Sequence, residues 1–189
     1  MDLQKYIKVV DNILPFETVS SILKFANKEL KENKFIDSLI GSGEGALNKE
    51  IRNVQHLNLN ISSTSLTNVH YHNLLSKIFL EIAKEYIKDH PYVDKITEVI
   101  QLDILRYIEG GHYKYHVDDG HSFNRILSCI LFLNNDYKNG DLCFKFEEQE
   151  VLIKPKPGKL IMWPSNFLFP HCVKPISKGV RFSIVSWMR

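Results

Sequence analysis

The chain has 189 residues, of which 44% are hydrophobic and 24% are charged. This length fits one domain with a single core, and the composition excludes a mainly disordered, collagenous or coiled-coil protein. The net charge of +2 is too small to indicate nucleic acid or an anionic membrane as the partner. No apolar run reaches the roughly 18 residues of a membrane helix, and the first ten residues lack a signal-peptide pattern.

Cysteine usage points to a reducing environment. The three cysteines are an odd number, are widely spaced and include no Cys-x-x-Cys pair. This pattern argues against a disulfide framework or a cysteine zinc site, and we expect a cytoplasmic protein. Nothing in the sequence indicates its oligomeric state.

The first half of the chain carries two helical patterns. Apolar residues recur at helical spacing after Pro15 and again from Leu74 to Ile87, with charged residues on the opposite faces. Pro91 is expected to end the second helix. Both apolar stripes predict helices that pack on a sheet.

The segment between these helices, residues 36–69, contains Gly41, Gly43 and Gly45. It lacks the phosphate-loop pattern, so a flexible flap is the better interpretation. A surface loop and a functional lid, centred on residues 37–50, both fit it.

From Thr97 onward the pattern changes to short strands separated by turn signals. The expected strands are Val99–Tyr107, Tyr113–Asp118, Ile126–Leu133, Asp141–Phe146, Glu150–Lys154, Lys159–Trp163, His171–Pro175 and Val180–Met188. About eight short strands in ~90 residues are typical of a sandwich or barrel. We therefore expect one mainly β (α+β) domain over 1–189, with 1–96 as helical support and lid and 97–189 as the β core.

The most informative segment contains His116 and Asp118. Residues i and i+2 of a strand point to the same face, so these two side chains can reach one ion together. His171, on a later strand, is available as a third ligand. Two histidines and one carboxylate are the ligand set of non-haem Fe(II) oxygenases. A His-x-Asp pair alone is a weak signal because most such pairs are polar surface residues, and His112 is a nearby alternative ligand.

Arg181 follows His171 on the last expected strand, and Ser183 shares its face. The planar guanidinium fork matches a carboxylate, and the hydroxyl adds a donor. An inward-facing arginine in this apolar strand would be costly to bury without an anionic partner. Three interpretations stay open: an Asp or Glu of the protein, a strand face open to water, or the carboxylate of a co-substrate.

At this point the sequence resembles a known family. Tyr107, Gly110, Tyr113, His116 and Asp118 match the pattern Y-x-x-G-x-x-Y/F-x-x-H-x-D in register. That pattern is typical of the prolyl 4-hydroxylase-like branch of the Fe(II)/2-oxoglutarate-dependent dioxygenases. Later blocks, Pro157–Ile161 and His171–Trp187, also fit that branch in unbroken order. The resemblance covers roughly residues 97–189, about half of the chain.

The resemblance implies a double-stranded β-helix, or jelly roll, with the N-terminal helices packed on the major sheet. It implies that His116, Asp118 and His171 bind iron at the catalytic centre. Arg181 would pair with the distal carboxylate of 2-oxoglutarate, and Tyr107 would add a hydrogen bond there. Ser183, which shares the strand face of Arg181, is a further candidate for binding the co-substrate.

Two positions bear on the subfamily. Collagen-type and plant-type members usually carry Lys at the position of Arg181, whereas oxygen-sensing prolyl hydroxylases carry Arg. The oxygen-sensing members also place a carboxylate-binding Tyr where this chain has Phe132. The departures leave the co-substrate role intact and the subfamily open.

The implied function is hydroxylation of a prolyl residue in a peptide or protein. Iron, O2 and 2-oxoglutarate would be required, with 2-oxoglutarate decarboxylated to succinate and ascorbate as a reductant. One alternative keeps this chemistry on a free amino acid, another side chain or a small metabolite. An alternative of another class is a non-catalytic jelly-roll binding module. We expect no nucleic acid or membrane partner.

Overall fold

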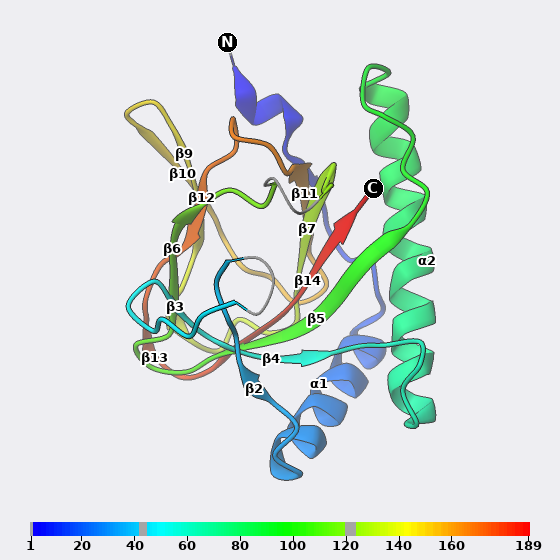
Figure 1. Cartoon of the computed structure of the whole chain (residues 1–189), viewed down its shortest axis with the longest axis vertical. Helices are drawn as coiled ribbons and strands as arrows, with labels where there is room; N and C mark the ends of the chain where they lie inside the picture. The colour runs from blue at the N-terminus through cyan, green and yellow to red at the C-terminus, as the bar shows by residue number, and fades with distance from the viewer. Residues whose placement is uncertain (1, 42–44, 120–123) are drawn as a thin grey trace.

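Two antiparallel sheets face each other at the centre of the fold (Figure 1). The computed structural model describes residues 2–41, 45–119 and 124–189. In these ranges the larger sheet has the order β1-β11-β7-β14-β5-β4-β2, and the smaller sheet has the order β10-β9-β12-β6-β3. A short ribbon of β13 and β8 lies apart from them. The arrangement agrees with the predicted jelly roll.

The helices and strands have the following bounds. The helical elements are the 3-10 helix η1 (Leu3–Tyr6), α1 (Phe16–Lys31) and α2 (Leu66–Asp89). The first strands are β1 (Lys8–Val10), β2 (Ile36–Asp37), β3 (Arg52–Asn53), β4 (Gln55–Asn58), β5 (Val99–Tyr107), β6 (His112–His116) and β7 (Leu127–Phe132). The later strands are β8 (Lys138–Asn139), β9 (Leu142–Phe146), β10 (Gln149–Ile153), β11 (Leu160–Pro164), β12 (His171–Val173), β13 (Ile176–Lys178) and β14 (Arg181–Met188).

Strand β14 runs through the middle of the larger sheet and shows how that sheet divides two cores. Phe182 and Ile184 join the core under the helices, whereas Val185 and Trp187 join the core between the sheets. Every residue of β14 is buried, because both faces of the strand are covered. The alternation places Arg181 on the inter-sheet side with Val185 and Trp187.

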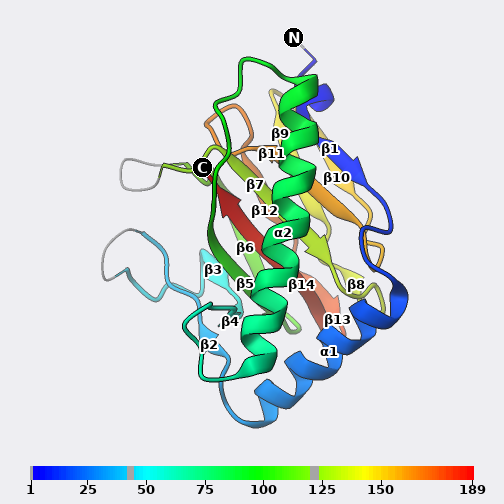
Figure 2. The ribbon, with the colours of Figure 1, turned by 90° about the vertical axis from the view of Figure 1, so that its right-hand side faces the viewer.

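Both helices cover the outer face of the larger sheet (Figure 2). Helix α2 begins eight residues before Leu74, where the predicted apolar stripe starts, because Ser65 caps it by accepting a hydrogen bond from the backbone N–H of Asn68. It ends before Pro91, as expected. No helix within the described ranges has the length and apolar character needed to cross a bilayer.

The first 96 residues contribute more than helices and a flap. Strands β1, β2 and β4 extend the larger sheet, and β3 extends the smaller one. These strands are two to four residues long, which is too short for an alternating pattern to be recognised in the sequence. Residues 42–44, and with them Gly43 of the predicted flap, lie outside the described residues.

Phe79 on α2 tests the packing of this layer. Its side chain is fully buried at 0% exposure, so Phe79→Ala should lower the free energy of unfolding by about 3–5 kcal/mol. Phe16, at the start of α1, is 73% exposed and gives a matched control, since Phe16→Ala should change stability by less than about 0.5 kcal/mol. Urea unfolding followed by circular dichroism measures both. Equal losses for the two variants would contradict this packing.

Candidate metal centre

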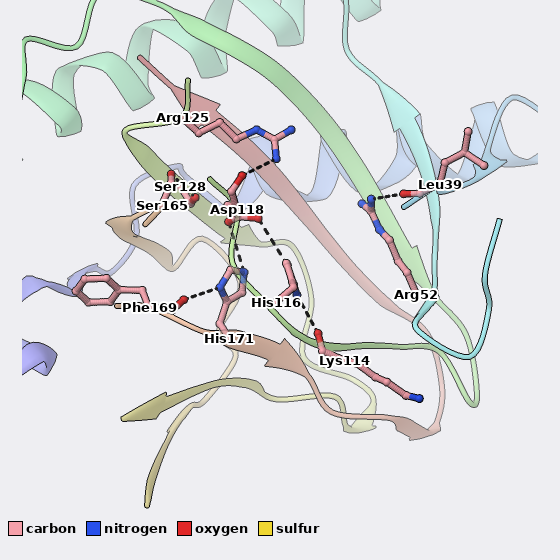
Figure 3. A network of polar contacts seen from close by, with 10 residues as sticks. All are labelled: Leu39, Arg52, Lys114, His116, Asp118, Arg125, Ser128, Ser165, Phe169 and His171. Carbon is pink, nitrogen blue, oxygen red and sulfur yellow. Dashed lines mark hydrogen bonds and ion pairs between the residues drawn. The ribbon is translucent and has the colours of Figure 1, made fainter. Parts of the chain in front are cut away.

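Three side chains from two separate stretches of the chain meet at one end of the inter-sheet space (Figure 3). The ligand atoms that His116, Asp118 and His171 offer lie within 4.8 Å of one another. The two histidines face each other across paired strands, since His171 of β12 is in register with His116 of β6. The structure thus brings together the three residues that the sequence singled out.

The route by which Asp118 reaches this cluster differs from the prediction. Strand β6 ends at His116, so Asp118 lies in a bend beyond it and not on the same strand face. Arg125 donates a hydrogen bond from Nη1 to the Asp118 carbonyl at 3.1 Å, and the N–H of Asp119 bonds to the Ser165 carbonyl at 2.9 Å. These backbone contacts fix the bend, and they aim the carboxylate at the histidines.

Each histidine is oriented by a backbone carbonyl. Nδ1 of His116 lies 2.9 Å from the Lys114 carbonyl oxygen, and Nδ1 of His171 lies 3.1 Å from that of Phe169. A carbonyl only accepts, so each Nδ1 must carry the proton, which leaves the Nε2 lone pair free. Both Nε2 atoms point at the carboxylate of Asp118, at 3.6 Å from His116 and 3.5 Å from His171. This is the tautomer that binds a metal through Nε2.

The protonation states also suit a cation. Burial lowers the pKa of His171 to about 4, so its imidazole is neutral at physiological pH. Burial disfavours the charged form of Asp118, but the two neighbouring histidines outweigh this effect and hold the carboxyl pKa below its ordinary value. One buried oxygen of that carboxylate, Oδ2, has no hydrogen-bond partner among the described residues. Two imidazole rings and one under-satisfied carboxylate fit a divalent metal such as Fe(II).

His112, the alternative ligand, belongs elsewhere. Its Nδ1 lies 2.9 Å from the Gly110 carbonyl oxygen, and its Nε2 lies 3.2 Å from that of Glu50. Both ring nitrogens are therefore engaged by the loop at the start of β6, away from the cluster.

Arg181 lies deeper, fully buried between the sheets at 0% exposure. Its Nη1 donates to the Gly140 carbonyl at 3.0 Å, but its Nε and Nη2 have no hydrogen-bond partner in the described part of the chain. The guanidinium carbon lies 5.1 Å from the ring centroid of Tyr107 and 5.2 Å from that of Phe132. The Ser183 hydroxyl, on the same strand face, is also buried and unpartnered.

These contacts bear on two of the interpretations of Arg181 left open by the sequence, namely a strand face open to water and a carboxylate of the protein. The residue does not face water, and no carboxylate of the described residues pairs with it. A buried guanidinium with unused donors beside an unused hydroxyl fits an anionic group such as the distal carboxylate of 2-oxoglutarate. Tyr107 contributes a ring beside the guanidinium, and the hydrogen bond expected from it stays a prediction.

A cavity of about 820 Å³ opens beside the cluster. Its walls include Asp118, Tyr113 and Trp187 near the cluster, and Ile36 and Leu39 at the outer end. The last two side chains are 59% and 46% exposed, so the cavity reaches the surface. It does not extend to Arg181, which lies beyond the cluster in the interior.

The wall formed by the residues around β2, β3 and β4 was missed by the sequence reasoning. Asp37, Arg52 and His56 all line the cavity, although each lies in the segment that was predicted to be a flap. The Arg52 guanidinium carbon lies 4.8 Å from the Tyr113 ring centroid and Nη1 donates to the Leu39 carbonyl at 2.9 Å. These contacts join residues that are far apart in the sequence, so no local sequence pattern predicts them.

Comparison with known proteins finds similarity to one family of enzymes. The family described as the 2OG-Fe(II) oxygenase superfamily matches residues 102–189. A PKHD-type hydroxylase from Synechococcus sp. (strain CC9902) is 36% identical over 121 residues, covering 60% of this chain and 54% of the relative. The chain thus spans about half the length of that relative. A PKHD-type hydroxylase from Crocosphaera subtropica is 27% identical and covers 96% of this chain and 78% of the relative.

Solved structures share the fold. A prolyl hydroxylase from Trichoplax adhaerens, in complex with a hypoxia inducible factor peptide fragment, superposes with a TM-score of 0.77 at 18% identity, over 97% of this chain and 83% of the other. A Pseudomonas putida prolyl-4-hydroxylase gives a TM-score of 0.75 at 18% identity, over 97% and 92%. At this identity the likeness concerns the fold, and it confirms the predicted jelly roll with helical support.

Asp118→Asn tests the cluster. The change keeps the shape of the side chain but removes its charge, so Co(II) or Fe(II) affinity should fall by at least ~100-fold. Asp119→Asn is the matched control, because this neighbouring carboxylate is exposed and lies outside the cluster. Anaerobic calorimetric titration measures both affinities. A similar affinity for the two variants would remove Asp118 from the metal site.

Proposed function

We propose that the chain carries a prolyl 4-hydroxylase-like domain of the 2OG-Fe(II) oxygenase superfamily, and that it hydroxylates a prolyl residue in a peptide or protein. In this proposal His116, Asp118 and His171 bind Fe(II), and Arg181 binds 2-oxoglutarate with help from Tyr107 and Ser183. The observation that supports it most strongly is the coexistence of two buried, incompletely matched charges. These are the Asp118 carboxylate in the cluster and the Arg181 guanidinium deeper inside.

The charges of the proposed complex balance. Fe(II) carries +2, Asp118 −1, the 2-oxoglutarate dianion −2 and Arg181 +1, which sums to zero. A buried site of this kind is tolerable because each charge has a partner. Bound Fe(II), 2-oxoglutarate and O2 supply the oxidation, in which one oxygen atom enters the substrate C–H bond and the other enters succinate as CO2 is released.

The protein's own groups orient and shield the reactants. The carbonyls of Lys114 and Phe169 keep both histidines in the metal-binding tautomer. His116 stacks on the Tyr113 ring with centroids 3.5 Å apart, and His171 packs edge-on against Trp163 at 4.9 Å. These rings hold the ligands in place and exclude water from one side of the site.

The open cavity supports a peptide substrate over a small one. Exposed apolar side chains at its outer end would let an extended chain continue past the reactive residue. The solved prolyl hydroxylase with a bound peptide fragment supports the same substrate class, and the relatives named PKHD-type hydroxylases support hydroxylation. The alternative with a free amino acid or small metabolite uses the same groups and differs only in what fills the cavity. Ascorbate as reductant and the cytoplasmic location stay predictions.

A substrate panel tests the proposal. The purified protein with Fe(II), 2-oxoglutarate and ascorbate should add one oxygen atom to a proline-containing peptide and form an equal amount of succinate, both measured by mass spectrometry. Turnover confined to free amino acids would favour the small-metabolite alternative. Absence of turnover, together with absence of metal and 2-oxoglutarate binding, would favour the non-catalytic binding module.

Arg181→Ala separates co-substrate binding from metal binding. A desolvated charged hydrogen-bond pair is worth about 2–5 kcal/mol, so the 2-oxoglutarate KM should rise by about 30-fold or more. The Co(II) affinity should change by less than about threefold. Arg181→Lys keeps the charge without the fork and should give an intermediate KM. Parallel loss of metal and 2-oxoglutarate affinity in Arg181→Ala would show that Arg181 is structural.

A further inference from the structure

Tyr137 has a buried polar group that no part of the proposed mechanism uses. It lies in the connection between β7 and β8, one residue before β8 begins. Its hydroxyl is buried and has no hydrogen-bond partner among the described residues. An unsatisfied buried hydroxyl is costly, so a role for it should be sought in what the site binds.

The ring is placed next to the group that holds Arg181. A Cβ built on Gly140 would lie 3.4 Å from Cε2 of Tyr137, the ring carbon adjacent to the one bearing the hydroxyl. The carbonyl of Gly140 accepts the hydrogen bond from Nη1 of Arg181 at 3.0 Å. Arg181 and Tyr107 both act electrostatically on the Tyr137 hydroxyl. The tyrosine and the guanidinium therefore belong to one neighbourhood, although they are far apart in sequence.

The unused donors of this neighbourhood match one carboxylate. Arg181 offers Nε and Nη2, and Ser183 and Tyr137 each offer a hydroxyl, which makes four donors without a partner among the described residues. A carboxylate presents about four lone-pair sites, which three residues with these donors can fill. Gly140 already occupies Nη1, so the guanidinium alone does not complete the set.

The ring of β7 that packs against Arg181 cannot supply a further donor. Phe132, whose ring centroid lies 5.2 Å from the Arg181 guanidinium carbon, carries no polar group. We propose that the Tyr137 hydroxyl, from the β7–β8 connection, donates a hydrogen bond to the distal carboxylate of 2-oxoglutarate. This inference rests on the proposed function, since it assigns a further binding residue to the same co-substrate.

The ionisation of Tyr137 suits a donor. Burial raises the pKa of the hydroxyl to about 12, and the opposing effect of Arg181 does not cancel it. The group stays protonated at neutral pH and can donate to an anion without repelling it.

Tyr137→Phe tests the assignment. Anaerobic calorimetry on the Mn(II)-loaded protein should show 2-oxoglutarate binding weakened about 10- to 100-fold, because a hydrogen bond to a charged group is lost. The Mn(II) affinity should be unchanged. The melting temperature of the ligand-free variant should also be unchanged or higher, because the removed hydroxyl bonds to no described protein group. A purely structural tyrosine would instead lower the melting temperature.

Tyr86→Phe is the matched control. Its hydroxyl is engaged within the protein, donating to the Tyr6 carbonyl at 2.8 Å under the helices. Removing it should lower the melting temperature and leave 2-oxoglutarate affinity at the wild-type value. Wild-type 2-oxoglutarate affinity in Tyr137→Phe, with the wild-type protein binding normally, would overturn the inference alone. Failure of the wild-type protein itself to bind 2-oxoglutarate would overturn the proposed function together with it.

Discussion

Asp118 and Arg181 place opposite charges in the space between the two sheets, and neither is fully matched by another group of the described protein. Removing a charge from water is costly unless a partner replaces the hydration. The two residues do not neutralise each other, because each has its own set of neighbours. Asp118 faces two imidazole rings, which suits a cation, whereas Arg181 faces the Ser183 hydroxyl and aromatic rings, which suits an anion. The interior therefore offers two neighbourhoods whose chemistry suits ligands of opposite charge.

Most residues around Asp118 come from one sheet, and those around Arg181 come from the other. The histidines come from β6 and β12 of the smaller sheet, while Arg181 and Ser183 come from β14 of the larger one. Asp118 lies in the bend that leaves the smaller sheet, and Arg125 and Ser165 hold it there. The complete site exists only while the sheets face each other, so the core between them that includes Trp163 and Val185 also determines the geometry of the site. The helices affect the geometry of the site only indirectly, because they stabilise the outer face of the larger sheet.

Much of this could be predicted from the sequence, and the successes share a cause. The strands from Val99 onward lie between clear turn signals, and the pairs His116/Asp118 and His171/Arg181 each lie within a short stretch of the chain. Strands β1 to β4 escaped prediction because two to four residues cannot show a period. The expected strand Tyr113–Asp118 was wrong at its end, because β6 stops at His116 and the bend that follows is held by Arg125 and by Ser165, which is distant in sequence. Tyr137 carries no motif at all, and only its unpartnered hydroxyl distinguishes it.

We expect that one metal ion binds at the cluster of His116, Asp118 and His171, and that 2-oxoglutarate reaches from it to Arg181. A crystal structure of the protein with Mn(II) and 2-oxoglutarate under anaerobic conditions tests it most directly. The account predicts one metal ion bound by Nε2 of His116, Nε2 of His171 and the Asp118 carboxylate, with the distal carboxylate of 2-oxoglutarate against Arg181. A metal bound by other residues, or a diacid whose distal carboxylate lies away from Arg181, would contradict it.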